Sequence, residues 1–124
     1  MDKSLTSFIG NKLTVDVEVL RTPSGTVIAN VRPVGSMITS ERETISESID
    51  FIKSIDGQFV VMDTTEVGSV DSWGIGTILM LNGELALKQR RFSIVVQDGA
   101  VCNFLRRVGV MEIIRSRPLI HQAA

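Results

Sequence analysis

FVVMD at residues 59–63 and DSWGIGTIL at residues 71–79 decide the fold of this chain. The first segment is a short run of apolar residues, typical of a strand that is covered on both faces of a parallel sheet. In the second segment the apolar residues recur with the period of a helix. The residues expected to face the core are Ile75, Ile78, Leu79 and Leu85. The pattern therefore predicts a buried strand, a loop, and a helix that begins near Asp71.

The beginning of this helix is the candidate functional site. Asp71 and Ser72 are residue types that cap helices, and the positive end of the helix dipole suits an anion or an acidic group of a partner. Gly74 and Gly76 each cost ~1 kcal/mol relative to alanine inside a helix, so we expect them to serve close packing or close approach of another surface. Trp73 either packs onto the neighbouring loop or is an exposed anchor for a partner.

The order of strand, acidic loop, D-S-[S/T]-G-[L/I]-G and apolar helix resembles the STAS domain, the fold of bacterial anti-sigma factor antagonists. The motif is matched without a gap by Asp71-Ser72-Trp73-Gly74-Ile75-Gly76. In the antagonists, the residue before the first glycine is a Ser or Thr that is phosphorylated by a partner kinase, itself an anti-sigma factor. Here that residue is Trp73, which cannot accept a phosphate. The resemblance implies the fold, whereas the usual phosphorylation site is missing.

The resemblance also implies a non-enzymatic interaction module that regulates transcription by partner switching. The partner would be an anti-sigma factor that is also a serine-protein kinase and binds ATP, which this chain would not. With Trp73 in the acceptor position, either the regulation is lost or it moves to Ser72, the candidate phosphorylation site, with Ser69 as a weaker one. A phosphate of about −2 charge beside Asp71 would repel an acidic partner surface. The candidate partner-binding residues are Ser69, Asp71, Ser72, Trp73, Gly74 and Gly76.

A second hypothesis is a cytosolic STAS accessory subunit of an ABC-type lipid transport system, which would need no phosphorylation. The chain also departs from the family at the exit of an earlier strand. Family members usually have a sequence like Gly-Glu-Leu-Asp there, and this chain has Gly35-Ser36-Met37-Ile38. The rim of the expected binding face is therefore less acidic than is usual in the family.

Length and composition narrow the class of protein. The chain of 124 residues fits a single STAS-like domain over residues 1–124, and 44% hydrophobic with 22% charged residues is ordinary for a globular protein. A formal net charge of −1 argues against a nucleic-acid partner. The single cysteine, Cys102, allows no intramolecular disulfide, which favours the cytoplasm. We find neither a signal peptide nor an apolar segment of about 20 residues, so no membrane insertion is expected.

The sequence contains none of the catalytic motifs that we considered. A nucleophile elbow, G-x-S-x-G, would need a glycine where Val70 precedes Ser72, and the only histidine, His121, lies near the end of the chain. Asp63 at a strand end lacks the acidic pair with which receiver domains hold Mg²⁺. The usual zinc, P-loop and dinucleotide motifs are also missing. We therefore expect no catalytic residues, no cofactor and no metal site.

The remaining segments complete an α/β prediction. Residues 1–11 suggest a loose start or a short edge segment, and residues 13–20 and 26–34 suggest an antiparallel hairpin around a turn at 22–25. A helix is expected next, with a capping box of Ser40 and Glu43, an apolar stripe of Ile45, Ile49 and Ile52, and a left-handed cap at Gly57. After the helix that begins near Asp71, we expect a strand at 92–96, a helix at 101–108, a strand at 110–114 and a tail at 115–124. This order predicts a STAS-like, mostly parallel sheet of four to five strands with an N-terminal antiparallel hairpin and three or more helices.

Overall fold

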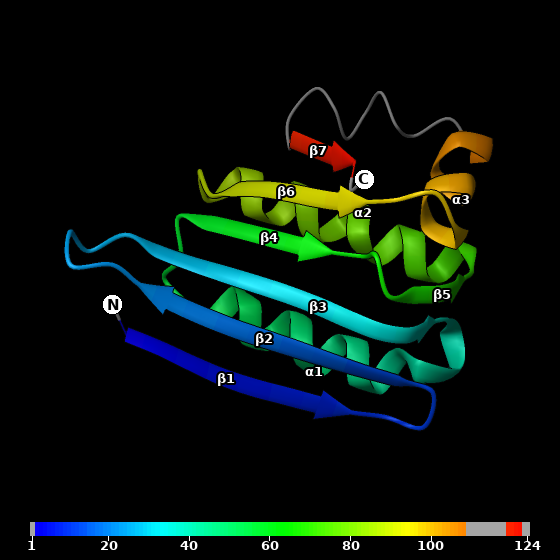
Figure 1. Ribbon diagram of the computed structural model, residues 1–124, viewed down its shortest axis with the longest axis horizontal. Coiled ribbons are helices and arrows are strands. Elements are labelled where there is room, and N and C mark those ends of the chain that lie inside the picture. Colours follow the sequence, from blue (N-terminus) through cyan, green and yellow to red (C-terminus); the bar gives the residue numbers. More distant parts are fainter. Residues whose placement is uncertain (1, 109–118, 123–124) are drawn as a thin grey trace.

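A mixed β-sheet forms the centre of the protein, as a computed structural model describes it for residues 2–108 and 119–122 (Figure 1). Its strands are β1 (Asp2–Ile9), β2 (Leu13–Arg21), β3 (Val27–Met37), β4 (Phe59–Asp63), β5 (Val67–Val70), β6 (Arg91–Val96) and β7 (Leu119–Gln122). The helices are the 3₁₀ helix η1 (Thr39–Glu41), α1 (Arg42–Ser54), α2 (Ser72–Leu87) and α3 (Ala100–Val108). α1 and α2 lie on one face of the sheet, and α3 packs beside β5 at one end (Figure 1).

The strand order corrects the prediction of a mostly parallel sheet with four to five strands. Within the described residues, seven strands form a mixed sheet in the order β1-β2-β3-β4-β6-β7, with β5 pairing the far end of β3. β2 is antiparallel to both of its neighbours, β1 and β3, and the later pairings are parallel. The predicted N-terminal hairpin is confirmed, and Gly25 takes the positive φ of 89° that its turn requires.

Two strands that precede α2 were not expected from the sequence. The N-terminal segment, predicted as a loose start or a short edge segment, forms the eight-residue edge strand β1, which pairs with β2 along its whole length. Its Phe8 packs against Phe51 of α1 with ring centroids 5.6 Å apart. β5 lies in what the sequence suggested was only a loop, and it joins β3 beyond a register shift at Gly35. Both strands depend on pairing with a distant partner, which local patterning does not reveal.

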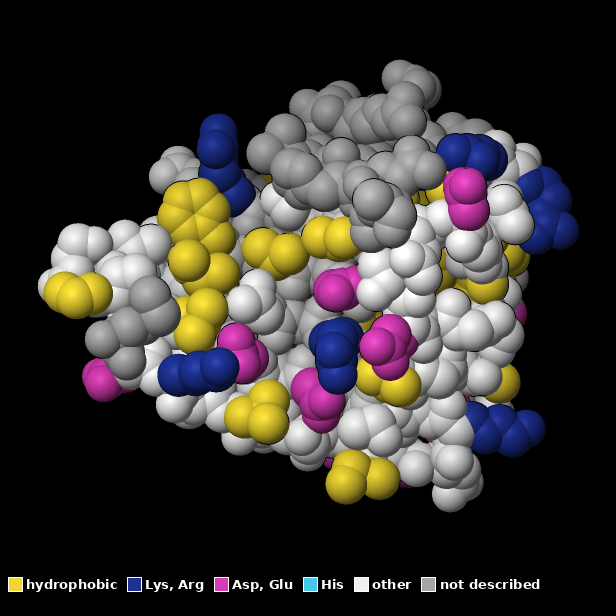
Figure 2. Space-filling view, in the orientation of Figure 1, with side chains coloured by type: hydrophobic (Ala, Val, Ile, Leu, Met, Phe, Trp, Pro, Cys, Tyr) yellow, Lys and Arg dark blue, Asp and Glu magenta, His cyan; other side chains and the backbone are white. Residues whose placement is uncertain are grey.

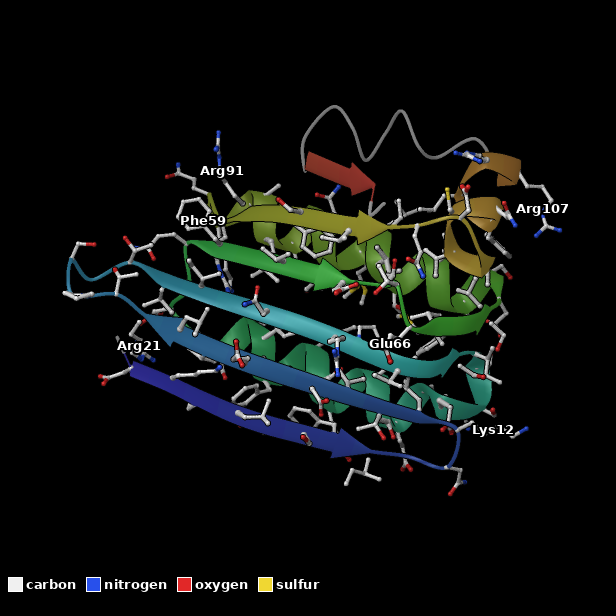
Figure 3. All side chains as sticks on the ribbon, viewed as in Figure 1. Lys12, Arg21, Phe59, Glu66, Arg91 and Arg107 are labelled. Atoms are coloured by element: carbon white, nitrogen blue, oxygen red, sulfur yellow. The ribbon has the colours of Figure 1, made fainter. Side chains whose placement is uncertain are left out.

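The core lies between the sheet and the two helices α1 and α2. Leu13, Val15, Val17 and Val19 of β2 are buried, as their alternation predicts. β4 buries Val60 and Met62, but its other side chains are half-buried or exposed, so the expected cover on both faces is wrong for this strand. Figure 2 shows the open face of the sheet, where charged side chains lie among apolar ones. Phe59 and Arg91 lie together there at the start of β4 and β6 (Figure 3).

The start of α1 differs from the predicted capping box. Ser40 lies within η1, and the residue before α1 is Glu41, with no side-chain cap. Glu41 is only 4% exposed despite its charge, and its Oε1 accepts a hydrogen bond from the backbone N–H of Lys12. The predicted apolar stripe of α1 is confirmed, because Ile45, Ile49 and Ile52 are all buried.

The end of α1 is also held differently from the prediction. Gly57 does not adopt the left-handed conformation expected of a cap. Instead, the Arg90 guanidinium donates to the carbonyl oxygens of Gly57 and Ile52. A residue from the connection between α2 and β6 therefore satisfies carbonyl groups at the end of α1.

The buried face of α2 is rotated slightly from the prediction. Ile75, Ile78 and Leu85 are buried as expected, but Leu79 is only partly buried. Leu81, which was not among the predicted core residues, is fully buried in its place. The predicted strand at 110–114 lies outside the described residues. The predicted tail contains β7, which pairs with β6 in parallel.

Candidate functional site

The candidate site is the junction where α2 begins. Three other elements meet the start of α2: the end of β3, the 3₁₀ helix η1 and the end of β5. Asp71 links β5 to α2, and its backbone N–H donates to the Met37 carbonyl oxygen at 3.4 Å. An aspartate suits this position, because β5 ends at Val70 and α2, which begins at Ser72, needs a cap.

The Asp71 carboxylate connects α2 to η1. Its Oδ1 accepts from the Gly74 N–H at 2.9 Å, which is the N-cap bond of α2. Its Oδ2 accepts from the Thr39 N–H at 2.9 Å and from the Thr39 hydroxyl at 2.8 Å. Of the two residues that the sequence suggested as caps, Asp71 caps α2, and Ser72 is the first residue of the helix.

These hydrogen bonds set the ionisation of the site. Partial burial favours the neutral acid and would raise the pKa of Asp71. The bonds from the Gly74 N–H and from both donors of Thr39 outweigh this effect and hold the pKa below its ordinary value of 3.8. Asp71 is therefore a carboxylate at neutral pH, and its charge is already engaged within the fold.

Two serine hydroxyls belong to the same junction. Ser69 is exposed and its hydroxyl donates to the Ser36 hydroxyl at 2.8 Å, while the Ser72 side chain is exposed at the helix start. Ser36 and Thr39 were not among the predicted site residues. Ser36 lies within the strand exit that departs from the family pattern, and Thr39 follows that exit directly, but only the fold brings Thr39 against Asp71.

The two glycines of the motif have different environments. A Cβ at Gly74 would clash with the carbonyl group of Met37, so this glycine lets the helix approach the end of β3 closely. A Cβ at Gly76 would meet nothing within 4 Å. The sequence predicted close packing or close approach for both. Close packing within the chain explains Gly74 alone.

Trp73 lies at the edge of a groove between α1 and α2. Its side chain is half-buried and packs against the core. The groove has a volume of about 480 Å³, and its walls are Ser46, Ile49, Asp50 and Lys53 of α1 and Ser72, Trp73, Gly76, Thr77 and Met80 of α2. At the other end of the groove the Lys53 ammonium lies 3.0 Å from Glu84 Oε2. Trp73 is therefore partly core and partly surface, and its role as an anchor for a partner stays a prediction.

The chemistry of the site suits the recognition of another surface. The junction offers hydroxyl groups, one engaged carboxylate and an indole ring. Within residues 2–108 and 119–122, the structure contains no group of three His, Cys, Asp or Glu side chains that could hold a metal ion. In the same ranges, none of the helices has the length and apolar character needed to cross a membrane.

Comparison with known proteins adds a family and two similar structures. A family model described as the STAS domain matches residues 19–123. An anti-sigma factor antagonist from Mycobacterium paratuberculosis superposes with a TM-score of 0.66 at 15% identity, covering 94% of this chain and 86% of that chain. An uncharacterized protein of the DUF3478 family from Shewanella loihica PV-4, which has a SpoIIAA-like fold, gives a TM-score of 0.55 at 13% identity and covers 93% and 89%. No curated protein sequence gives a significant match.

Proposed function

The chain belongs to the STAS domain family, and we propose that it acts as a protein-interaction module without enzymatic activity. The proposed partner is an anti-sigma factor of the kinase type, and the proposed process is the control of transcription by partner switching in the cytoplasm. The observation that carries this proposal is the surface at the start of α2, where Ser69, Ser72 and Trp73 are accessible around a structurally engaged Asp71. A similar structure that is an anti-sigma factor antagonist supports it.

Ser72 is the proposed phosphorylation site. Its side chain is exposed and belongs to the first residue of α2, where free N–H groups and the helix dipole stabilise a phosphate. The same phosphate would lie next to Asp71, which is ionised at neutral pH. The added charge of about −2 would then repel an acidic partner surface and would be costly to desolvate in an interface.

Trp73 is the proposed anchor for the partner. Because part of its side chain packs on the core while another part lines the groove, it presents a rigid apolar surface. Rigid aromatic side chains at the centre of an interface commonly contribute ~2 kcal/mol or more when truncated. Asp71 and Gly74 support this surface indirectly, since both hold the start of α2 in place.

The experiment compares binding to a kinase-type anti-sigma factor of the same organism by titration calorimetry. Trp73→Ala is expected to weaken binding at least about tenfold, and Ser72→Asp to weaken it partially. Ser24→Asp is the matched control, because it adds the same charge at an exposed serine in the β2–β3 turn. Incubation with the kinase and ATP, followed by mass spectrometry, should place the phosphate on Ser72.

Either of two results would contradict this proposal. Unchanged affinity of Trp73→Ala would remove the proposed face, and a phosphate within α1 would place the switch elsewhere. Phosphate on Thr39 or Ser69 would keep the junction as the switch but would refute the assignment to Ser72.

One observation favours the second hypothesis, an accessory subunit of an ABC-type lipid transport system. Trp73 occupies the position at which a phosphate acceptor is expected, and docking on a transport ATPase needs no phosphate. The two functions are distinguished by co-purification from the native cell. Recovery of an ABC ATPase with the wild-type chain, and loss of it with Trp73→Ala, would support the transport subunit over the anti-sigma factor antagonist.

A further inference from the structure

The composition of α2 is unusual for a helix that lies on the surface of a sheet. Glu84 is the only charged residue between Ser72 and Leu87. The face toward the sheet is buried, yet the opposite face is also apolar. A helix that is apolar around its whole circumference is normally covered on both sides. Within the described residues, the structure covers α2 on one side with the sheet and leaves the outer side open.

The outer face carries a regular stripe, which we call the outer stripe of α2. It consists of Trp73, Gly76, Met80, Gly83 and Leu87. Steps of three and four residues place all five on one side of a helix, in the pattern of a heptad repeat. Met80 is 48% exposed and Leu87 is 86% exposed. Large apolar side chains therefore alternate along the stripe with glycines.

The glycines of the outer stripe have no explanation within the chain. A Cβ at Gly76 or at Gly83 would meet nothing within 4 Å. Each glycine inside a helix costs ~1 kcal/mol relative to alanine. Two such costs on the same face are offset if another helix approaches there, because a missing side chain lets the two backbones come close.

We propose that the outer stripe binds the outer stripe of a second copy of this chain, with the two α2 helices antiparallel. With the twofold axis level with Ile78, Trp73 of one copy lies over Gly83 of the other, and Met80 lies over Gly76. Each large side chain thus meets a glycine, and the symmetry repeats both contacts. This self-complementarity is what a twofold interface requires, and it selects a second copy over an unrelated helix.

The charges at the two ends of α2 match this arrangement. Lys88 directly follows the helix, and Asp71 directly precedes it. In the antiparallel pair, Lys88 of each copy lies toward the end of α2 at which the other copy carries Asp71, whose carboxylate keeps its bonds to Thr39 and Gly74 of its own chain. The two helix dipoles also oppose each other, which is favourable. A parallel pair would instead place like charges together at each end.

This self-association would share Trp73 with the partner face described under the proposed function, and Gly76 with the partner-binding residues predicted from the sequence. A dimer would therefore hide that face, and the partner and the second copy would compete. The inference does not require the proposed function, because the chain alone is enough to test it. Gly83, Met80 and Leu87 belong to the outer stripe only, so variants there separate the two hypotheses.

The first test is the oligomeric state of the purified chain, measured by sedimentation velocity across the micromolar range. We expect a concentration-dependent dimer, and Gly83→Leu should weaken it at least about tenfold by filling the position opposite Trp73. The substitution projects into open space in the monomer, so the fold should be kept. Glu47→Leu is the matched control, since it adds a leucine to an exposed position of α1 outside the groove.

The second test measures the register. A chain with Gly76→Cys is mixed with a chain carrying Met80→Cys, and the mixture is oxidised under mild conditions. The antiparallel pair predicts that the mixed disulfide forms faster than either disulfide between identical variants. The native Cys102 is buried and should not contribute.

Three results would overturn the inference. A chain that stays monomeric at every concentration has no such interface. A dimer that Gly83→Leu and Glu47→Leu leave equally intact uses another surface. Disulfides formed mainly between identical variants would exclude the antiparallel register. If the chain is monomeric but binding to the anti-sigma factor is lost in Trp73→Ala, the proposed function stands while the self-association fails.

Discussion

α1 and α2 lie next to each other on the same face of the sheet, but they differ in how they meet solvent. α1 has a buried stripe that includes Ile45, Ile49 and Ile52, and its other faces carry charged residues, as expected of an amphipathic helix. α2 has an equally buried face, but Met80, Gly83 and Leu87 lie on its open side. The exposed faces of α1 are therefore suited to contact with water, whereas the exposed face of α2 is suited to contact with another protein.

The same difference separates two kinds of residue within α2. Leu81, Leu85 and Gly74 are explained by contacts within the chain. Gly76, Gly83 and Leu87 are exposed, and no close packing within the chain explains the two glycines. The predictions below test whether the inner face of α2 determines stability while the outer face leaves it nearly unchanged.

The largest effect is expected for the inner face. Leu81→Ala should lower the free energy of unfolding by ~2–5 kcal/mol, because Leu81 is fully buried and its removal leaves a cavity. Leu87→Ala, at 86% exposure, is the matched control and should change it by less than ~0.5 kcal/mol. Urea denaturation at low protein concentration measures both. Equal effects of the two substitutions would show that the two faces of α2 are not distinct.

The two glycines of the motif should respond in opposite directions. Gly74→Ala is expected to destabilise the protein by ~1–3 kcal/mol, since the new methyl group would clash with the Met37 carbonyl and the backbone must move. Gly76→Ala is expected to stabilise it by ~0.4–1 kcal/mol, because alanine restricts the unfolded chain and fills open space. Thermal unfolding of the two variants side by side gives the sign of each change. A loss of stability in Gly76→Ala would reveal an internal contact on the outer stripe.

The cap at the start of α2 should give a smaller, pH-dependent effect. Asp71→Ala is expected to cost ~1 kcal/mol at neutral pH. Since the pKa of Asp71 is lowered in the folded state, this contribution is complete above the ordinary value of 3.8 and is lost as the pH falls through the lower folded-state pKa. Urea titrations of wild type and variant at several pH values measure the difference. Glu47→Ala, which removes an exposed carboxylate from α1, is the control for the loss of one negative charge.

The smallest effect is expected for the ion pair that joins the two helices. Lys53 and Glu84 are about one third exposed, and their charged atoms are 3.0 Å apart. A double-mutant cycle with Lys53→Ala and Glu84→Ala should give a coupling of ~0.2–1 kcal/mol that decreases with added salt. A larger, salt-independent coupling would mean that the groove between α1 and α2 is less hydrated than its exposure indicates.

The sequence and the structure agree best where the pattern is local. The hairpin of β2 and β3, the buried stripe of α1 and the cap at Asp71 follow from alternation, helical period and capping chemistry. Agreement is weaker where a distant partner decides. β5 has too few residues to be recognised without β3, and the buried position of Glu41 depends on the Lys12 N–H. The heptad spacing of the outer stripe is present in the sequence, but the apolar residues of the inner face prevent it from being distinguished there.

What the sequence determined by itself was the order of most elements and the place at which α2 begins. The spacing of apolar residues and the residue types at the helix start are local properties, so they can be recognised from the sequence alone. Only the tertiary structure decided which parts of that helix start are free to act. Thr39 engages the Asp71 carboxylate and Met37 confines Gly74, whereas Gly76 remains open. These roles depend on backbone groups that reach the site from β3 and η1, because steric contact and hydrogen bonding act across space and leave no local pattern in the chain.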